Sequence, residues 1–414
     1  LQTETDTVIA SNVGGLVGYS LLCDIMDVNY KVAYTQYSDG RAYNSFRVTS
    51  GNANVGAIVG NAVSSRIKVI SLTESKSRDI DSARPQDSST TPIVVNCLAR
   101  ESRATTNFGS IAGVLNSSNI TNAENALSGI SIVGNAKSVK TIIAGGIIGD
   151  VFTSTMTSVE NSANISISNQ TLNDTLENQF KLAGIAGRVR GEVSISNAQN
   201  RGQVNVSGTT MTQTTGYVGG LIGEVVCGTM VARISASRNL ANISATKLYN
   251  ANVGGIVGRV AIDVDNADNL GNCRIIETYN ECSITTESDC ANEEISGGLI
   301  GFANRLNVNN SYSVGRVISK TLSADSQISV GGFIGRLHQA GVQPTLSYCY
   351  SVVVVKALAD PIKNKVYSKE FVGYTSLTSQ NVNTVVFGSC YYAGELAQSN
   401  DSLREGYTQN MHDY

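Results

Sequence analysis

The sequence predicts an all-β fold: a repetitive parallel β-solenoid in which residues 1–414 form a single repeat domain. Three observations predict it. A glycine-rich motif returns at intervals of 34 to 53 residues, and a second, asparagine-containing motif follows several of its copies at a similar distance. The composition favours turns and β-branched strands, with 40 glycines and only 15% charged residues. A β-prism or a β-propeller, whose units have a similar length, is the alternative.

The glycine-rich motif has nine good copies, and the segment "FVGYTS" at 371–376 is a degenerate tenth. The good copies lie at 13–18, 55–60, 108–113, 144–149, 182–187, 218–223, 253–258, 296–301 and 330–335. So many copies are typical of stacked structural units, because a phosphate-binding loop would be needed once and would carry a Walker lysine. We expect the glycines to allow close approach of neighbouring backbones and the central apolar residue to fill the core. These central residues are Leu16, Ile58, Ile147, Leu221, Ile256, Leu299 and Phe333.

The second motif predicts a corner of the solenoid. Aligned copies place an asparagine in one slot, a small residue two positions later and an aliphatic residue two positions after that. The asparagine slot holds Asn161, Asn200, Asn239 and Asn280, and then passes to Ser313, Ser351 and Ala393. Asparagine tolerates left-handed turns and its amide can stack in ladders, so we expect a structural ladder here.

The two motifs together resemble the GLUG repeat. The resemblance rests on G-G-L-[VI]-G followed by N-S-x-[NS]-x-[GA]-x-[VI], and it covers about residues 11 to 396. Proteins with this repeat include bacterial surface adhesins and the region beside the metallopeptidase domain of immunoglobulin A proteases. The resemblance implies an extracellular or cell-surface spacer or adhesive array. It does not carry the peptidase over, because the zinc signature H-E-x-x-H is absent from this chain.

Nine N-x-[ST] sequons are candidate sites for covalently attached glycans. They lie at Asn116, Asn119, Asn164, Asn169, Asn173, Asn205, Asn242, Asn309 and Asn400. Chance matches are the competing explanation, because the chain is rich in asparagine, serine and threonine. Three sequons add a structural argument: the period-two alternation of strands predicts that Asn164, Asn205 and Asn242 point outward.

The eight cysteines contain no C-x-x-C pair, so disulfides are favoured over a zinc or redox site, with buried free thiols as the alternative. Cys349 and Cys390 align with each other, and adjacent strands at about 4.8 Å would bring their Cα atoms within disulfide range. Cys273, Cys282 and Cys290 lie in one long repeat and could supply another bridge. The polar segment 73–91 is expected to be a loop extruded from the solenoid.

The net charge of −3 predicts no nucleic-acid partner, and no apolar run is long enough for membrane insertion. We expect no cofactor, no metal site and no enzymatic activity, although parallel β-helices include polysaccharide-active enzymes. Such enzymes need clustered carboxylates and often aromatic sugar platforms, and the chain has no tryptophan.

A solenoid exposes an open β-edge at each end, and only a dozen residues precede the first good motif. The favoured hypothesis is therefore an extracellular structural glycoprotein that assembles head to tail into a fibre or surface coat. The alternative is an adhesin or a stalk segment of a cell-surface protein.

Overall fold

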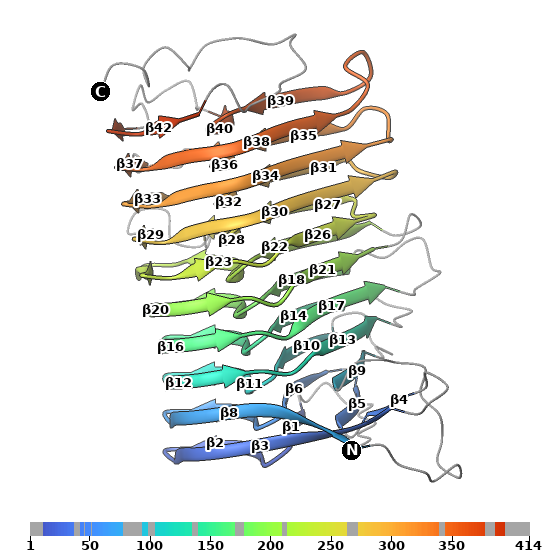
Figure 1. Ribbon diagram of the computed structural model, residues 1–414, viewed down its shortest axis with the longest axis vertical. Helices are drawn as coiled ribbons and strands as arrows, with labels where there is room; N and C mark the ends of the chain where they lie inside the picture. Colours follow the sequence, from blue (N-terminus) through green and yellow to red (C-terminus); the bar gives the residue numbers. More distant parts are fainter. Residues whose placement is uncertain are drawn as a thin grey trace.

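The chain folds as a parallel β-solenoid, as the repeats predicted. The structure, a computed structural model, describes residues 11–36, 42–44, 46–50, 52–77, 93–97, 104–134, 140–169, 178–208, 213–262, 272–338, 344–376 and 386–393. These residues form strands and turns without a helix. The successive coils lie on top of one another along the long axis of the molecule (Figure 1). Each strand pairs with its counterpart in the next coil, which is inconsistent with the separate blades of a propeller.

Three sheets run the length of the solenoid. Sheet A contains β1 (Ser11–Gly14), β6 (Ala53–Gly56), β10 (Ala104–Gly109), β14 (Lys140–Gly145), β18 (Asn178–Ala183), β22 (Thr214–Gly219), β27 (Asn250–Gly254), β31 (Glu293–Gly297), β35 (Gln327–Gly331) and β39 (Lys365–Lys369). Sheet B contains β2 (Val17–Leu21), β7 (Val59–Val63), β11 (Ala112–Asn116), β15 (Ile148–Phe152), β19 (Ala186–Arg190), β23 (Ile222–Cys227), β28 (Val257–Ile262), β32 (Ile300–Ala303), β36 (Ile334–His338) and β40 (Val372–Ser376).

Sheet C has 22 strands and receives two segments from a typical coil. The first segments are β3 (Asp24–Gln36), β8 (Arg66–Ser77), β12 (Asn119–Asn125), β16 (Thr155–Asn161), β20 (Val193–Asn200), β24 (Ala232–Ser235), β25 (Arg238–Asn239), β29 (Cys273–Ile276), β33 (Leu306–Asn309), β37 (Thr345–Ser347) and β41 (Val386–Gly388). The others are β4 (Ala42–Asn44), β5 (Phe46–Ser50), β9 (Ile93–Cys97), β13 (Gly129–Gly134), β17 (Asn164–Asn169), β21 (Val204–Ser207), β26 (Ile243–Thr246), β30 (Tyr279–Ser288), β34 (Tyr312–Thr321), β38 (Tyr350–Leu358) and β42 (Tyr391–Tyr392). Only β3 and β4 pair antiparallel among these strands.

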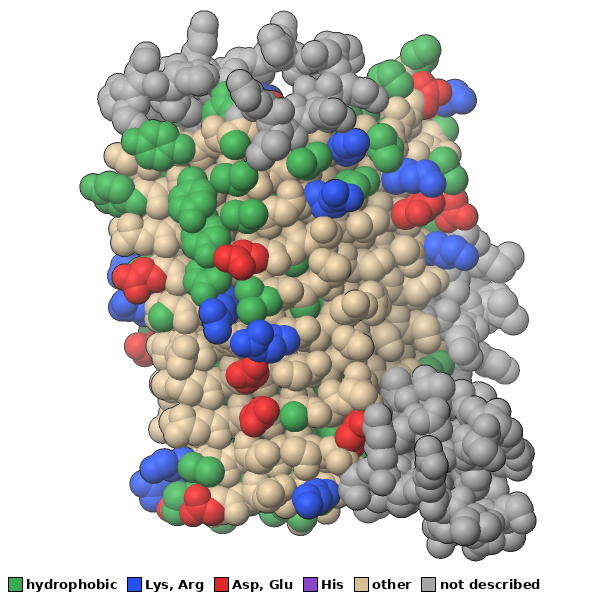
Figure 2. Space-filling model, viewed as in Figure 1, with side chains coloured by type: hydrophobic (Ala, Val, Ile, Leu, Met, Phe, Trp, Pro, Cys, Tyr) green, Lys and Arg blue, Asp and Glu red, His purple; other side chains and the backbone are tan. Residues whose placement is uncertain are grey.

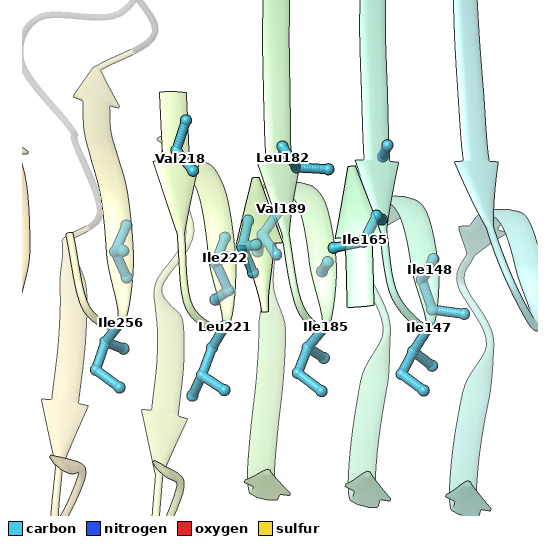
Figure 3. Close-up of a cluster of buried hydrophobic side chains, with 14 of the residues drawn as sticks. Ile147, Ile148, Ile165, Leu182, Ile185, Val189, Val218, Leu221, Ile222 and Ile256 are labelled. Atoms are coloured by element: carbon cyan, nitrogen blue, oxygen red, sulfur yellow. The ribbon is translucent and has the colours of Figure 1, made fainter. Parts of the chain in front are cut away.

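The glycine-rich motif forms a tight arc that joins sheet A to sheet B. Its first residues end a strand of sheet A, its central apolar residue lies in the arc, and its last glycine lies in a strand of sheet B. Ile147, Ile185, Leu221 and Ile256 form one row along the solenoid core (Figure 3), and each is fully buried. The degenerate copy at 371–376 contains β40, which is the tenth strand of sheet B.

The last glycine of the motif is required by the close approach of sheets A and B. A Cβ atom on Gly223 would lie 2.8 Å from the backbone nitrogen of Leu182, in the preceding coil. Real side chains do not tolerate such a contact with backbone, so this position excludes even alanine without a shift.

A column of left-handed residues runs along sheet C and was not predicted. Each of the ten coils contributes to this column one non-glycine residue with a positive φ, always three positions before the asparagine slot or its equivalent. Other non-glycine residues with a positive φ lie outside the column, among them Leu22, Ser64, Ser117 and Thr153. The column consists of Asp27, Val69, Asn122, Ser158, Asn197, Ala236, Glu277, Asn310, Tyr348 and Ser389. The slot asparagines Asn161, Asn200, Asn239 and Asn280 do not themselves have a positive φ. The bend is made by these earlier residues, and the next residue returns its side chain to the core.

Two further expectations are corrected by the pairing. Residues 73–77 of the predicted loop continue strand β8, because they pair with residues 31–35 of β3; the remainder, from residue 78 on, lies outside the described residues. In the last coil, Ser351 pairs with Tyr392 rather than with Ala393, so the slot passes to tyrosine there.

Val69 is the poorest chemical fit to the left-handed column, because β-branched residues pay the largest steric penalty at positive φ. Val69 has a φ of 56°. We expect Val69→Asn, which introduces the residue that Asn122 and Asn197 already supply in this column, to raise the free energy of unfolding by about 1 kcal/mol. Urea denaturation measures this change in the free energy of unfolding. Val63→Asn, on a strand of ordinary β conformation, is the matched control, and an equal gain there would contradict the explanation.

Candidate functional site

The asparagine ladder lies inside the solenoid, between sheet C and the arc. Each Nδ2 atom donates to the Oδ1 atom of the next asparagine: Asn161 to Asn200 over 2.9 Å, Asn200 to Asn239 over 2.8 Å, and Asn239 to Asn280 over 2.9 Å. The second Nδ2 proton is also used; Asn200, for example, donates to the carbonyl of Gly202 over 2.9 Å. These amides are buried but satisfied, so the ladder is structural.

The ladder begins one coil earlier than the sequence indicated. Asn125 donates through Nδ2 to Oδ1 of Asn161 over 2.8 Å and to the carbonyl of Gly146 over 2.9 Å. The small-residue slot in the aligned segment after Asn125 is held by Leu127, a large side chain. Because the motif has a small residue at that position, the sequence pattern does not include Asn125.

The ladder and the glycine-rich arc form one unit. The second arc glycine lies directly against the ladder amide of its own coil: a Cβ atom on Gly184 would lie 2.1 Å from Cγ of Asn200, and one on Gly220 would lie 2.3 Å from Cγ of Asn239. In the second coil this arc position holds Ala57, and the ladder slot there holds Leu72 instead of an amide. Gly146, Gly184, Gly220 and Gly255 thus each lie against the ladder amide of their own coil, whereas the third coil combines Ser110 in the arc with Asn125 in the ladder.

The six sequon asparagines with described side chains all reach the surface. Asn119, Asn164, Asn242 and Asn309 are exposed, while Asn116 and Asn205 are half-buried. The prediction that Asn164, Asn205 and Asn242 point outward is therefore confirmed. Asn173 and Asn400 lie outside the described residues, as does the side chain of Asn169.

The expected disulfides are absent from the structure, which holds Cys349 and Cys390 as free thiols in adjacent coils. Both face the core from equivalent positions, because Tyr350 pairs with Tyr391. Side chains at in-register positions of parallel strands point the same way, so their Cβ atoms keep the strand spacing of about 4.8 Å, whereas a disulfide needs about 3.8 Å. A hydrogen bond between the two sulfurs raises the pKa of Cys349 and lowers that of Cys390.

The structure also leaves Cys273, Cys282 and Cys290 as free thiols with different neighbours. Cys273 interacts with Cys227 of the preceding coil, a residue without a predicted partner. Cys282 donates to Oδ1 of Asn280 over 3.1 Å, and Cys290 lies 3.5 Å from the hydroxyl of Ser288. Burial raises the pKa of Cys282 to about 12, so this thiol is inert.

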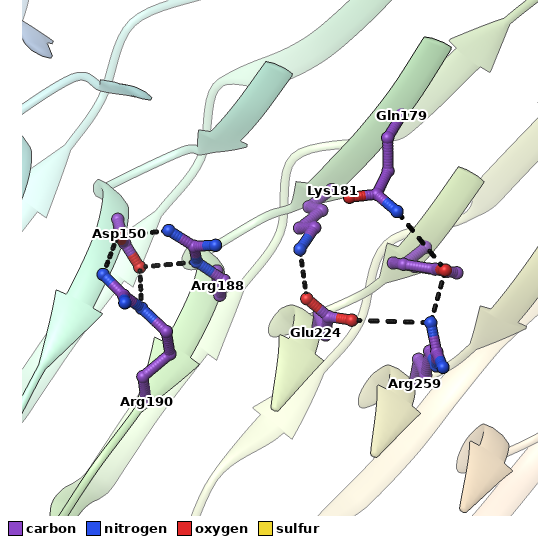
Figure 4. Close-up of polar contacts among 8 residues, drawn as sticks. Asp150, Gln179, Lys181, Arg188, Arg190, Glu224 and Arg259 are labelled. Atoms are coloured by element: carbon purple, nitrogen blue, oxygen red, sulfur yellow. Dashed lines mark hydrogen bonds and ion pairs between the residues drawn. The ribbon is translucent and has the colours of Figure 1, made fainter. Parts of the chain in front are cut away.

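Charged side chains gather in a seam between sheets A and B, where the tight arc turns the outward faces of the two sheets toward each other (Figure 4). Asp150 accepts two hydrogen bonds from Arg188, at 3.0 and 2.8 Å, and one of 2.7 Å from Nη2 of Arg190. Burial alone would raise the pKa of Asp150, but the two guanidinium groups outweigh it and hold that pKa below its usual value.

One coil further, Nζ of Lys181 pairs with Oε2 of Glu224, and Nη1 of Arg259 lies 3.7 Å from the other carboxylate oxygen. Burial lowers the pKa of Lys181 in spite of this pairing. The hydroxyl of Tyr217 accepts a hydrogen bond from Arg259, whose guanidinium lies 4.6 Å from the ring centroid. Glu293 of sheet A likewise pairs with Arg336 of sheet B. These three carboxylates thus have cationic partners, so the seam ties neighbouring coils together rather than offering a general base.

A buried carboxyl group, Glu294, occupies an inward position of sheet A that small residues occupy in the two coils before it. It accepts hydrogen bonds from Ser319 over 2.5 Å and Thr286 over 3.3 Å, while its Oε1 atom has no partner. Burial raises its pKa to about 7, against the hydrogen bonds of the two hydroxyls. The described residues contain no group of three or more His, Cys, Asp or Glu side chains that could hold a metal ion. Among these residues, no helix has the length and hydrophobicity that crossing a bilayer would require.

We expect Gly220→Ala to lower the free energy of unfolding by about 2 kcal/mol, because the added methyl overlaps both the ladder amide and a backbone oxygen. Its Cβ atom would lie 2.3 Å from Cγ of Asn239 and 2.1 Å from the carbonyl oxygen of Gly255. Gly228→Ala is the matched control, since nothing lies within 4 Å of its Cβ position. Urea denaturation measures both. Equal effects of the two changes would rule out the glycine–amide contact as the cause.

Glu294 makes the stability depend on pH in a defined direction. Its pKa is raised from 4.5 to about 7 in the folded chain, so the folded state holds the proton more tightly. Stability is therefore full below about pH 4.5 and is lost as the pH rises through 7, by about 3 kcal/mol for this one group. Glu294→Gln should remove that loss: the variant and the parent should match near pH 4, and the variant should be more stable near pH 8.5. A constant difference at all pH values would contradict the assignment.

No family model, curated protein or solved structure matches this chain. The GLUG resemblance accordingly stays a prediction from the motifs.

Proposed function

We propose that the protein is an extracellular structural glycoprotein, a subunit that assembles head to tail into a fibre or surface coat through its solenoid ends. The observation that carries the proposal is the exposure of core positions in the first coil. Leu16, in the arc column, is 50% exposed, whereas its equivalents Ile58, Ile111 and Ile147 are fully buried in the coils that follow.

Both ends present unpaired strand edges within the described residues. At one end, β1 and β2 pair only with β6 and β7; at the other, β39 and β40 pair only with β35 and β36. Val372 in β40 is likewise only half-buried, whereas Ile334, its equivalent one coil earlier, is fully buried. Open edges of this kind are templates for pairing with another chain.

The geometry of the fold favours a second copy as the occupant of these edges. Every coil is related to the next by parallel, in-register pairing, so a C-terminal coil can pair with the N-terminal coil of another copy by the same rule. The two contact surfaces differ, so the association is heterologous and does not close, which generates filaments.

The glycoprotein and extracellular parts of the proposal rest on the surface position of the described sequons and on the GLUG resemblance. The alternative role, an adhesin or stalk segment of a cell-surface protein, is favoured by the same repetitive solenoid, which would act as a spacer. A polysaccharide-active enzyme is the least favoured function. It would need a pair of carboxyl groups free to act on the sugar, and Asp150 and Glu224 are held by cationic side chains.

We expect negative-stain electron microscopy of the concentrated chain to show long uniform fibres, and Leu16→Arg to abolish them by placing a charge in the contact. Met230→Arg is the matched control, since Met230 is also 50% exposed but lies between β23 and β24 in the middle of the solenoid. It should leave the fibres intact. Isolated short rods from the unaltered chain would contradict head-to-tail assembly and favour the spacer role.

A further inference from the structure

A column of tyrosines lies on the outer face of sheet C over the C-terminal coils. Tyr279, Tyr312, Tyr350 and Tyr391 occupy the same position in four successive coils. The rings of Tyr279 and Tyr312 are 4.7 Å apart at 5° to each other, and those of Tyr312 and Tyr350 are 4.7 Å apart at 6°. Hydrophobic side chains gather on the upper left of this face, and charged side chains lie directly below them (Figure 2).

We propose that Tyr312 and Tyr350 form an oxidative cross-linking site, at which a peroxidase-type one-electron oxidant acting with hydrogen peroxide joins the two rings through their ortho carbons into dityrosine. The bond would link consecutive coils, whether or not the chain assembles into fibres. The proposal concerns a covalent modification and is independent of the proposed function.

The stacking supplies the proximity that the coupling needs. The two rings are nearly parallel with centroids 4.7 Å apart, so the ortho carbons of one ring lie close to the other ring, and both rings are attached to paired neighbouring strands. Holding two reactants side by side converts an encounter between molecules into an intramolecular step, which raises its effective concentration by orders of magnitude. Tyr350 is 41% exposed, so an oxidant can reach it, and its ring can pivot about the Cα–Cβ and Cβ–Cγ bonds to bring the ortho carbons together.

The surroundings distinguish Tyr312 from Tyr279. The hydroxyl of Tyr312 donates to Oε1 of Glu281 over 2.7 Å, so its proton has an acceptor when the ring loses an electron. Tyr279 instead receives a hydrogen bond of 3.0 Å from Nη1 of Arg238, and this positive charge disfavours oxidation of its ring. The chemistry therefore favours the Tyr312–Tyr350 pair. Tyr391, which is 55% exposed and in register with Tyr350, is the next partner along the column.

The reaction balances with hydrogen peroxide as the terminal oxidant. Each of the two tyrosines loses one electron and its phenolic proton, giving two phenoxyl radicals. The radicals form one carbon–carbon bond between ortho carbons. Each ring then loses its ortho hydrogen and regains the phenolic one, so the pair loses two hydrogen atoms in total. Hydrogen peroxide accepts the two electrons and two protons and becomes two molecules of water.

The test is to treat the full chain with a peroxidase and hydrogen peroxide over a dilution series, digest it, and sequence the cross-linked peptides by mass spectrometry. We expect the dominant cross-link to join Tyr312 and Tyr350, with a mass lower by two hydrogen atoms and a yield that dilution does not change. Tyr312→Phe and Tyr350→Phe, which keep the stacked rings, should each abolish that cross-link. Glu281→Gln should slow its formation several-fold, because the proton acceptor is lost.

Tyr249→Phe is the matched control, since Tyr249 is half-buried and lies outside the column; it should leave the yield unchanged. The proposal is overturned if the dominant dityrosine joins other tyrosines, if its yield falls on dilution as a reaction between molecules would, or if the unaltered chain forms none. It is also overturned if the two phenylalanine variants, folded by circular dichroism, still give the same cross-linked peptides.

Discussion

The contact between the second arc glycine and the ladder amide is the constraint on which the middle coils of the solenoid depend. An asparagine amide inside a protein core is costly unless all its hydrogen bonds are made. Here the amides of Asn161, Asn200 and Asn239 each bond to the amides of the coils before and after them. Because Gly184 and Gly220 lack a Cβ atom, the arc can lie directly on Asn200 and Asn239. Sheets A, B and C are thereby held around one narrow core, and each coil presents the same surface to the next.

The strands keep their register from coil to coil, even though the segments between them vary in length. The arc and the strands of sheets A and B keep their register through all ten coils, although the spacing between the last glycines of successive motifs ranges from 34 to 53 residues. The longest spacing contains residues 78–92, which lie between β8 and β9 of sheet C, and residues 263–271 lie between β28 and β29. At the N-terminal end of the described solenoid the arc residue Leu16 is exposed, whereas its counterpart in the last coil, Phe371, is buried.

In-register stacking also decides the chemistry of the surface and of the core. Equivalent positions of successive coils form a column, so a residue type that recurs from coil to coil makes contacts with its own copies. Tyr279, Tyr312 and Tyr350 become a stack of rings in this way. The seam between sheets A and B shows the complementary case, in which one column of sheet B alternates in charge over four coils, through Asp150, Arg188, Glu224 and Arg259, so that neighbouring charges neutralise each other. Glu294 is the exception, since no cation shares its position in the core and burial therefore shifts its pKa.

The residue pattern alone predicts the class of fold and most of the asparagine ladder, because these features use the same residue types in several successive coils. Features that do not rely on a recurring residue type are visible only in the tertiary structure. The left-handed column includes Val69, Glu277 and Tyr348, which share a backbone conformation and no side-chain chemistry. Cys349 and Cys390 occupy equivalent positions of adjacent coils, as their alignment predicted. Their side chains point in the same direction, however, and they form no disulfide. Pairs such as Lys181 with Glu224 depend on the arc, which folds strands from different coils against each other at a distance that no local pattern records.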